Sequence, residues 1–110
     1  MVLLQEASMR TGAEGAMIQR FYEKIRTFFP ELFWYKIPDF PGGPLRPFDV
    51  FAVISGHTFC IEFKIDDALK PHQIFFLELA RKNGAISFSV YPETFDSGIE
   101  RIQKCVRRKK

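Results

Sequence analysis

Hydrophobic residues recur along this chain with two different periods, and the periods predict its helices and strands. Between Ala13 and Phe29 the apolar residues return every three or four positions, which is the spacing of one face of an α-helix, and Pro30 marks the end of that helix. Aromatic and β-branched residues dominate three shorter segments, which predicts β-strands over residues 32–37, 48–54 and 58–65. The last two strands are joined at Ser55-Gly56-His57, where glycine permits the positive φ of a hairpin.

The second half of the chain repeats the two patterns. Pro71 suits the first position of a helix and Gly84 suits its end, so a second helix is expected between them. Residues 85–91 alternate apolar positions with serines, which predicts a half-buried strand, and a last helix is expected from residue 93 or 94 to Val106. The order α-β-β-β-α-β-α predicts an α/β fold with a mixed sheet flanked by helices and a C-terminal helix.

Composition is that of a folded domain. The chain has 110 residues, 46% of them hydrophobic, with thirteen Phe, which is enough for one core. We expect a single domain over residues 1–110, with an N-terminal extension at 1–12 and a basic tail at 107–110. Cys60 and Cys105 have no metal-binding or redox spacing, and we expect two reduced thiols in an intracellular protein.

Location and charge add two further expectations. No apolar run approaches the ~18 residues that cross a membrane, and the first residues lack the layout of a secretion signal. We therefore expect an intracellular protein. The formal net charge is +3, and the chain ends in "RRKK". Such a tail attracts phosphate, but basic tails also serve as solubilising ends, and both interpretations stand.

Three ionisable residues lie inside the predicted hairpin strands: Asp49 in the first, and Glu62 and Lys64 in the second. Because strand side chains alternate between faces, Glu62 and Lys64 share a face, and closing the hairpin brings Asp49 to the same end of the sheet. Burying these charges without partners costs several kcal/mol or more. One explanation is an internal ion pair of Lys64 with Glu62 or Asp49. The other is a cation site, because two carboxylates and a strand carbonyl supply the hard oxygen ligands that Mg²⁺ takes.

The same residues carry a family resemblance. Phe48-Asp49 and Ile61-Glu62-Phe63-Lys64 resemble the Asp…(Asp/Glu)-x-Lys motif of the PD-(D/E)XK nuclease superfamily, which has a restriction-endonuclease-like α-β-β-β-α-β core. More narrowly, the chain resembles the virus-type replication-repair nuclease (VRR-NUC) family over about residues 13–91. That family also shows a glutamate opening the N-terminal helix, here Glu14, and a "P-x-Q"-like helix start, here Pro71-His72-Gln73.

One departure concerns the proline of the motif, because Pro47 stands one residue further from Asp49 than in the family. A literal "PD" occurs at Pro38-Asp39, but this pair lies in a loop rich in proline and glycine. Asp39 opens no strand and is too far from Glu62 for the usual hairpin, so we assign the motif to Asp49.

The resemblance implies a Mg²⁺- or Mn²⁺-dependent DNA endonuclease that leaves a 5′-phosphate and a 3′-hydroxyl. It implies that Asp49, Glu62 and the Phe63 carbonyl hold the metal and that Lys64 orients the attacking water. Glu14 would support a second ion or its waters, with Glu23 as the alternative helix carboxylate, and Gln73 would hold Lys64 or the phosphate. Candidate contacts to the DNA backbone are Lys36, Arg46, Arg81, Arg107, Arg108, Lys109 and Lys110.

Stand-alone members of the family, often virus-encoded, resemble Holliday-junction resolvases that work as homodimers. The resemblance implies a role in DNA recombination and repair, in the cytoplasm, the nucleoid or the nucleus. The exposed face of residues 32–37 or the Phe75-Phe76 pair would then form the dimer surface. Three alternatives remain. The first is a nuclease of the same fold that trims flaps or nicks duplex without junction preference. The second is a non-catalytic nucleic-acid-binding module, and the third is an interaction protein whose charges form an internal ion pair.

Overall fold

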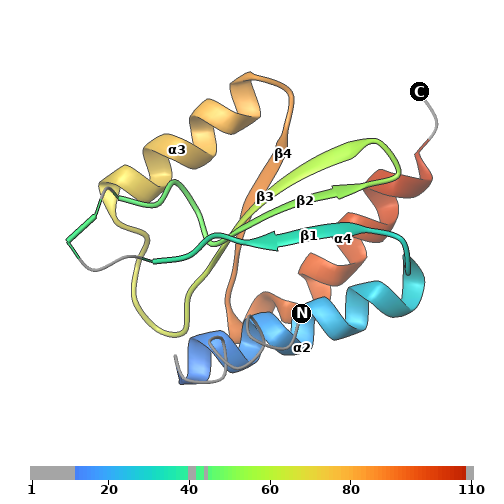
Figure 1. The fold of residues 1–110 in the computed structure, drawn as a ribbon, viewed down its shortest axis with the longest axis horizontal. Coiled ribbons are helices and arrows are strands. Elements are labelled where there is room, and N and C mark those ends of the chain that lie inside the picture. The colour runs from blue at the N-terminus through green and yellow to red at the C-terminus, as the bar shows by residue number, and fades with distance from the viewer. Residues whose placement is uncertain (1–11, 40–41, 44, 109–110) are drawn as a thin grey trace.

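A computed structural model describes residues 12–39, 42–43 and 45–108, so residues 1–11 of the N-terminal extension and Lys109 and Lys110 of the basic tail lie outside the described residues (Figure 1). The predicted order of elements is confirmed. The elements are α2 (Ala13–Phe28), β1 (Phe33–Lys36), β2 (Val50–Ile54), β3 (His57–Phe63), α3 (Pro71–Lys82), β4 (Ile86–Val90), the short 3₁₀ helix η1 (Pro92–Thr94) and α4 (Phe95–Arg107). No helix within the described ranges combines the length and the apolar character needed to cross a membrane.

The four strands form one mixed sheet in the order β1-β2-β3-β4. β1 pairs with β2 and β2 with β3 in antiparallel fashion, while β4 runs parallel to β3. A parallel neighbour needs a crossover connection, and α3 provides it. The expected mixed sheet flanked by helices, with a C-terminal helix, is therefore present.

The turn between β2 and β3 fixes the register on which the rest depends. Ser55 and Gly56 both have positive φ, 51° and 83°, and Ile54 pairs directly with His57. Two positive-φ residues are typical of the two-residue hairpin turn that matches strand twist. His57 thus begins β3, whereas the sequence had placed it in the turn. Counting back from this turn, Val50 lies opposite Ile61.

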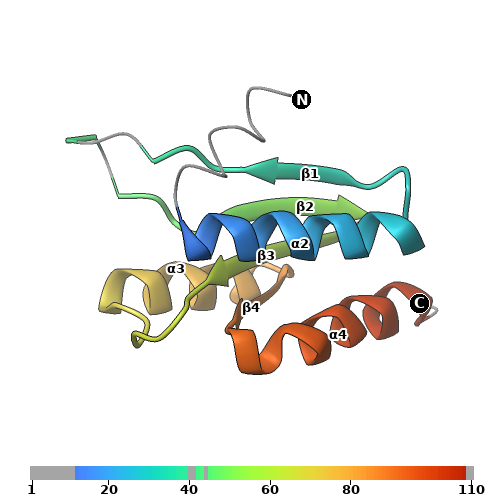
Figure 2. The ribbon, with the colours of Figure 1, turned by 90° about the horizontal axis from the view of Figure 1, so that it is seen from below.

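One face of the sheet carries the hydrophobic core against α2 and α4. Figure 2 shows these two helices on the near side of the sheet and α3 behind it. Alternate residues of the central strands are buried on this face. The ring of Phe21 lies at its centre, 5.2 Å from the ring of Phe63 and 5.3 Å from that of Phe95. α2 and α4 contact each other beside Gly98, where a Cβ atom would lie 3.2 Å from the Phe21 ring.

The other face of the sheet is covered only in part, because α3 packs on β4 and β3. Under α3, Ser87 is fully buried and its hydroxyl donates a hydrogen bond to the Leu77 carbonyl at 2.6 Å. The expectation of a half-buried strand with outward serines is therefore wrong at Ser87, which bonds to the helix above it. On the β1 and β2 half of this face, Phe33 and Tyr35 remain 54% and 43% exposed.

Candidate functional site

The three ionisable residues of the hairpin gather where β2 begins and β3 ends. Asp49 directly precedes β2, Glu62 is the next-to-last residue of β3, and Lys64 directly follows it. The backbone N–H of Asp49 donates to the Ile61 carbonyl at 3.1 Å, which extends the strand pairing to Asp49. Their exposed fractions are 1%, 4% and 6% respectively. Burial of three ionisable groups at one strand end is unusual enough to require an explanation.

Asp49 is held by groups on both of its oxygens. Oδ2 accepts a hydrogen bond from the Phe63 backbone N–H at 2.8 Å, and Oδ1 lies 3.0 Å from Nη2 of Arg46. Its carbonyl accepts a hydrogen bond from the Ile37 N–H at 2.8 Å. The first of these bonds directs the carboxylate across the sheet to the end of β3. Asp49 therefore points toward the strand that carries Glu62, as the sequence predicted.

Glu62 is oriented by Gln73 in the first turn of α3. Nε2 of Gln73 donates to Oε2 of Glu62 at 2.9 Å, and Oε1 of Gln73 accepts a hydrogen bond from the Lys70 N–H at 2.7 Å. The bond to Lys70 fixes which end of the amide faces the carboxylate. We had expected Gln73 to hold Lys64 or the phosphate, and its observed contact is instead with Glu62.

The site carries an excess of negative potential around Glu62. Burial above all, together with the negative charges of Asp49 and Glu14, raises the pKa of Glu62 to about 8, against the lowering by Arg46 and Lys64. A carboxyl whose pKa is raised in this way is stabilised in its ionised form by an added cation. The local charge thus favours a positive ligand.

The donor set fits a magnesium ion that keeps part of its water. Mg²⁺ is usually held through one or two protein carboxylates, with water and substrate phosphate completing the octahedron. Asp49, Glu62 and the Phe63 carbonyl are such a set. Among residues 12–39, 42–43 and 45–108, no group of three or more His, Cys, Asp or Glu side chains is close enough to enclose an ion. A Mg²⁺ ion held by Asp49 and Glu62 would have to complete its coordination with water or with oxygens of a substrate.

Lys64 brings a buried ammonium to the same end of the sheet. Within the described residues its only ion pair is with Asp67 at 3.9 Å, and the Asp67 side chain is 69% exposed. Tyr91 supports that loop, since its hydroxyl donates to the Asp67 carbonyl at 3.0 Å. The alternative of an internal ion pair from Lys64 to Glu62 or Asp49 is therefore wrong. The charge of Lys64 lowers the pKa of Glu62, but among the described residues its ammonium forms no ion pair with Glu62 or Asp49.

Glu14 is the helix carboxylate on which the charge of Asp49 acts. Glu14 lies in the first turn of α2 and is half-buried. Burial raises its pKa and the charge of Asp49 raises it further, while Lys64 lowers it. Glu23 is exposed and accepts a hydrogen bond from Gln19 at 3.0 Å. The charge of Asp49 thus reaches Glu14, although among the described residues Glu14, Asp49 and Glu62 do not form a group close enough to enclose an ion.

The predicted phosphate contacts are not all brought to the site. Lys36, at the end of β1, is half-buried and lowers the pKa of Glu14, so it lies near the cluster. Arg81, in the last turn of α3, donates to the Ser87 carbonyl at 2.9 Å. Arg107 and Arg108 lie at the end of α4, at the opposite end of the molecule from the start of α2 (Figure 1). The described part of the basic tail is therefore remote from the acidic cluster.

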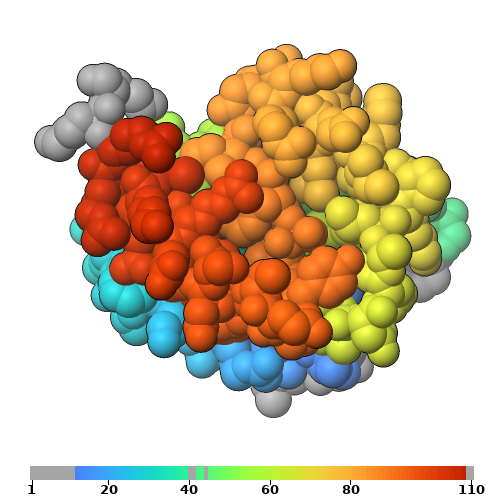
Figure 3. All heavy atoms as spheres, turned by 180° about the vertical axis from the view of Figure 1, so that it is seen from behind, coloured from blue at the N-terminus to red at the C-terminus, as the bar shows by residue number. Residues whose placement is uncertain are grey.

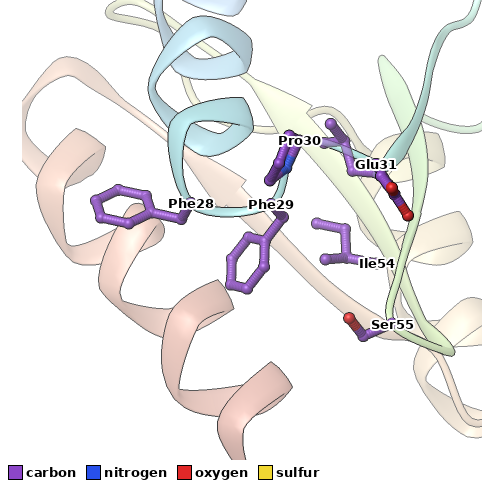
Figure 4. Close-up of a pocket in the computed structure, with 7 residues that line it drawn as sticks. Phe28, Phe29, Pro30, Glu31, Ile54 and Ser55 are labelled. Atoms are coloured by element: carbon purple, nitrogen blue, oxygen red, sulfur yellow. The ribbon is translucent and has the colours of Figure 1, made fainter.

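Two hollows in the surface lie outside the cluster. One, of about 400 Å³, is lined by Phe28, Phe29, Pro30, Glu31, Leu32, Ile54 and Ser55 at the β2–β3 turn (Figure 4). The other, of about 390 Å³, lies beside β4, η1 and the first half of α4, on the face of the molecule that Figure 3 shows. It is lined by Phe88, Ser89, Tyr91, Thr94, Ser97, Gly98 and Arg101. Neither hollow includes Asp49, Glu62 or Lys64, so neither is the candidate site.

Sequence reasoning missed two neighbours of the site. Arg46 was assigned to DNA contacts, whereas its guanidinium pairs with Asp49, and the pairing of Lys64 with Asp67 was not predicted. Both pairs join residues three positions apart, which is a signal that charge spacing could have given. Asp39 is exposed and lies outside any strand, as expected.

No protein-family model, curated protein or solved structure matches this chain.

Proposed function

We propose that this protein is a divalent-metal-dependent DNA endonuclease with a restriction-endonuclease-like fold, related to the PD-(D/E)XK nucleases. The observation that carries the proposal is the convergence of Asp49, Glu62 and Lys64, all buried, at one end of the β2–β3 pair. A purely structural cluster would pair its charges internally. Here the ammonium of Lys64 and the carboxylate of Glu62 form no ion pair with each other among the described residues.

Each side chain has a role that its contacts support. Asp49, Glu62 and the Phe63 carbonyl would hold a Mg²⁺ or Mn²⁺ ion, which when bound supplies charge to the scissile phosphate and lowers the pKa of an attacking water. Lys64 orients that water and stabilises charge that develops on the phosphate. Gln73 fixes the orientation of Glu62 through the hydrogen bond at 2.9 Å. Glu14 accepts hydrogen bonds from waters at the site.

The test is cleavage of supercoiled plasmid with Mg²⁺, Mn²⁺ or EDTA. Lys64→Met keeps the buried stem and removes the ammonium, so we expect turnover to fall by at least about 100-fold, in the range of lost charge stabilisation. Lys82→Met, in the exposed last turn of α3, is the matched control for a lost lysine. Cleavage by Lys64→Met at the wild-type rate would refute the role of Lys64.

Asp49→Asn is the matched test of metal binding. Asparagine keeps an oxygen that can accept the Phe63 N–H but loses the negative charge, so binding of Mn²⁺ and cleavage should both be lost while the fold persists. Asp39→Asn, an exposed aspartate near the same arginine, is its control. DNA binding without cleavage by the wild-type protein in every metal would instead favour the non-catalytic nucleic-acid-binding module.

We further propose that the substrate is branched DNA, such as a Holliday junction, rather than uniform duplex. The described surface offers few cations near the site, since Arg81, Arg107 and Arg108 lie elsewhere, so tight non-specific duplex binding is not expected. Comparison of cleavage of a four-way junction, a flap and a linear duplex of the same length tests this preference. Equal rates of cleavage on all three substrates would refute this preference and favour a nuclease of the same fold without junction preference.

We propose that the protein works as a homodimer through the uncovered half of the sheet. Two neighbouring strands are about 10 Å wide, which is the diameter of one helix. On α3, Leu77 is buried, and Phe75 and Leu79 lie on the exposed side of the helix. The α3 helix of one subunit could then cover β1 and β2 of the other, and the two-fold arrangement would repeat the contact.

The exposed apolar area matches this proposal. Phe33, Tyr35, Phe75 and Leu79 are 43–58% exposed, and together they present roughly 400 Å² of the ~800 Å² per partner in a standard interface. Light scattering on the wild type and on Phe33→Lys and Phe75→Lys provides the test. We expect a dimer that becomes a monomer in both variants. A wild-type protein that stays monomeric at high concentration would refute the homodimer.

A further inference from the structure

Arg46 occupies the position from which a divalent ion would reach Asp49. Of the two Asp49 oxygens, Oδ2 already accepts the Phe63 N–H, and Oδ1 is the one that Arg46 contacts at 3.0 Å. Nη1 of the same guanidinium donates to the Ile37 carbonyl at 3.1 Å. Asp39 is a distant second carboxylate, 3.9 Å from Nη2. Arg46 is thus a cation held from three directions, with 22% of its side chain exposed.

An arginine and a metal ion cannot share this oxygen at little cost. Metal–oxygen bonds of Mg²⁺ are 2.0–2.1 Å long. With Nη2 3.0 Å from Oδ1, an ion on Oδ1 would lie within about 5 Å of the guanidinium nitrogen. Like charges at that separation repel strongly in a partly buried site. One of the two cations must leave, and Arg46 is the one attached to a side chain that can rotate toward solvent.

We propose that Arg46 is a resident counter-ion of Asp49 that a divalent metal displaces, and that the released guanidinium then contacts a phosphate of the bound nucleic acid. The proposal rests on the nuclease function proposed above and adds to it the order of events at Asp49. In the metal-free protein, Arg46 neutralises Asp49 and fastens residues 37–39 to residues 46–49. In the metal-bound protein, the ion neutralises Asp49 instead. Arg46 is then a positioning residue that becomes a substrate contact.

The proposal predicts that removing the Arg46 guanidinium changes the affinity for metal and the affinity for DNA in opposite directions. Removing the guanidinium removes the competitor for Oδ1, so Arg46→Gln should bind Mn²⁺ at least about tenfold more tightly than the wild type. The same variant should bind DNA more weakly in the presence of metal, because one phosphate contact is lost. A residue that merely stabilised the loop would weaken the binding of both ligands. Tighter metal binding together with weaker DNA binding therefore distinguishes displacement of Arg46 from a structural role in the loop.

The experiment is calorimetric titration of Mn²⁺ into the wild type, Arg46→Gln and Arg26→Gln, with folding checked by circular dichroism. Arg26 lies in the last turn of α2, about 18 Å along that helix from Glu14, and controls for the loss of one positive charge. We expect tighter Mn²⁺ binding in Arg46→Gln and wild-type affinity in Arg26→Gln. Equal or weaker binding by a folded Arg46→Gln would overturn the role of Arg46 and leave the metal site standing.

A second measurement follows the guanidinium itself. The side-chain Nε–H resonance of Arg46, assigned by its loss in Arg46→Gln, should shift during a titration with Mg²⁺ at the midpoint of metal binding. A resonance that stays unchanged while Mg²⁺ binds would overturn the displacement. Failure of the wild type and of Arg46→Gln alike to bind any divalent ion would overturn the nuclease proposal itself, and the displacement with it.

Discussion

Metal binding should depend steeply on pH, because a divalent ion and a proton compete for Glu62. The pKa of Glu62 is raised from its ordinary 4.5 to about 8, chiefly by burial and then by the charge of Asp49. At neutral pH most of the free protein therefore carries a neutral Glu62. An ion can bind this carboxyl only after the proton leaves, so each unit of pH below 8 weakens the apparent affinity about tenfold.

The size of the effect follows from that pKa. At about pH 6, roughly one molecule in a hundred has an ionised Glu62, so Mn²⁺ should bind about 100-fold more weakly than on a plateau reached above pH 8. Near pH 7, binding should release close to one proton. Calorimetric titrations at constant ionic strength, in buffers with different ionisation enthalpies, measure the affinity and the proton count together.

The stability of the metal-free protein should change in the opposite direction. Because the folded pKa of Glu62 lies above the unfolded one, its stabilising contribution is fully present below about pH 4.5 and is lost as pH rises through about 8. The full effect is of the order of a few kcal/mol. Melting curves in EDTA should reveal this slope, and Glu62→Gln should flatten it, whereas Glu100→Gln on the exposed side of α4 should not. If the affinity for the metal did not change between pH 6 and pH 9, the assignment of Glu62 as a ligand would be refuted.

Three further predictions concern stability. Asp49→Ala leaves the buried Phe63 N–H and the Arg46 guanidinium without their acceptor. The free energy of unfolding in urea should therefore fall by about 2–4 kcal/mol, well more than in Asp49→Asn. Equal losses in the two variants would contradict this reasoning. Gly98→Val should lower the free energy of unfolding by about 2 kcal/mol, because its Cβ would lie 3.2 Å from the Phe21 ring and 3.3 Å from Val90. An unchanged melting temperature would mean that the ring moves aside. Ser87→Ala should cost about 1 kcal/mol for the hydrogen bond to Leu77, measured by thermal unfolding, and a more stable variant would show that the bond contributes nothing.

The order and type of the elements could be predicted because local signals agree with tertiary packing. Pro30 follows α2 within two residues, Pro71 opens α3, and Gly84 follows it with a φ of 97°. The convergence of Asp49 with Glu62 could also be predicted, because a two-residue side-chain period and a hairpin turn determine which residues face each other. Such inferences need only a short stretch of chain.

The partners of the site residues could not be predicted in the same way, because they come from separate elements. Gln73 reaches Glu62 only because the crossover from β3 sets the start of α3 over that strand end. Ser87 is buried although its strand alternates like a half-exposed one, because α3 covers it. The remote position of Arg107 and Arg108 depends on the direction of α4, which no local pattern encodes. The carboxylates thus follow from sequence, while the contacts that orient them require the tertiary fold.

The choice between a structural ion cluster and a reactive site turns on which charges neutralise each other. A structural explanation accounts for Asp49 with Arg46, an i,i+3 pair that closes the loop before β2. It does not account for Glu62, whose carboxyl is held by a neutral amide and whose pKa is raised to about 8. Nor does it account for Lys64, whose buried stem delivers an ammonium to the same point with only a long contact to an exposed aspartate. A fold gains little from placing an acid and an amine side by side without joining them, because apolar side chains would pack there at less cost. If Asp49 and Glu62 held a divalent ion and Lys64 acted on the attacking water and the phosphate, each of these residues would have a role, and for this reason we prefer the nuclease proposal to an interaction protein.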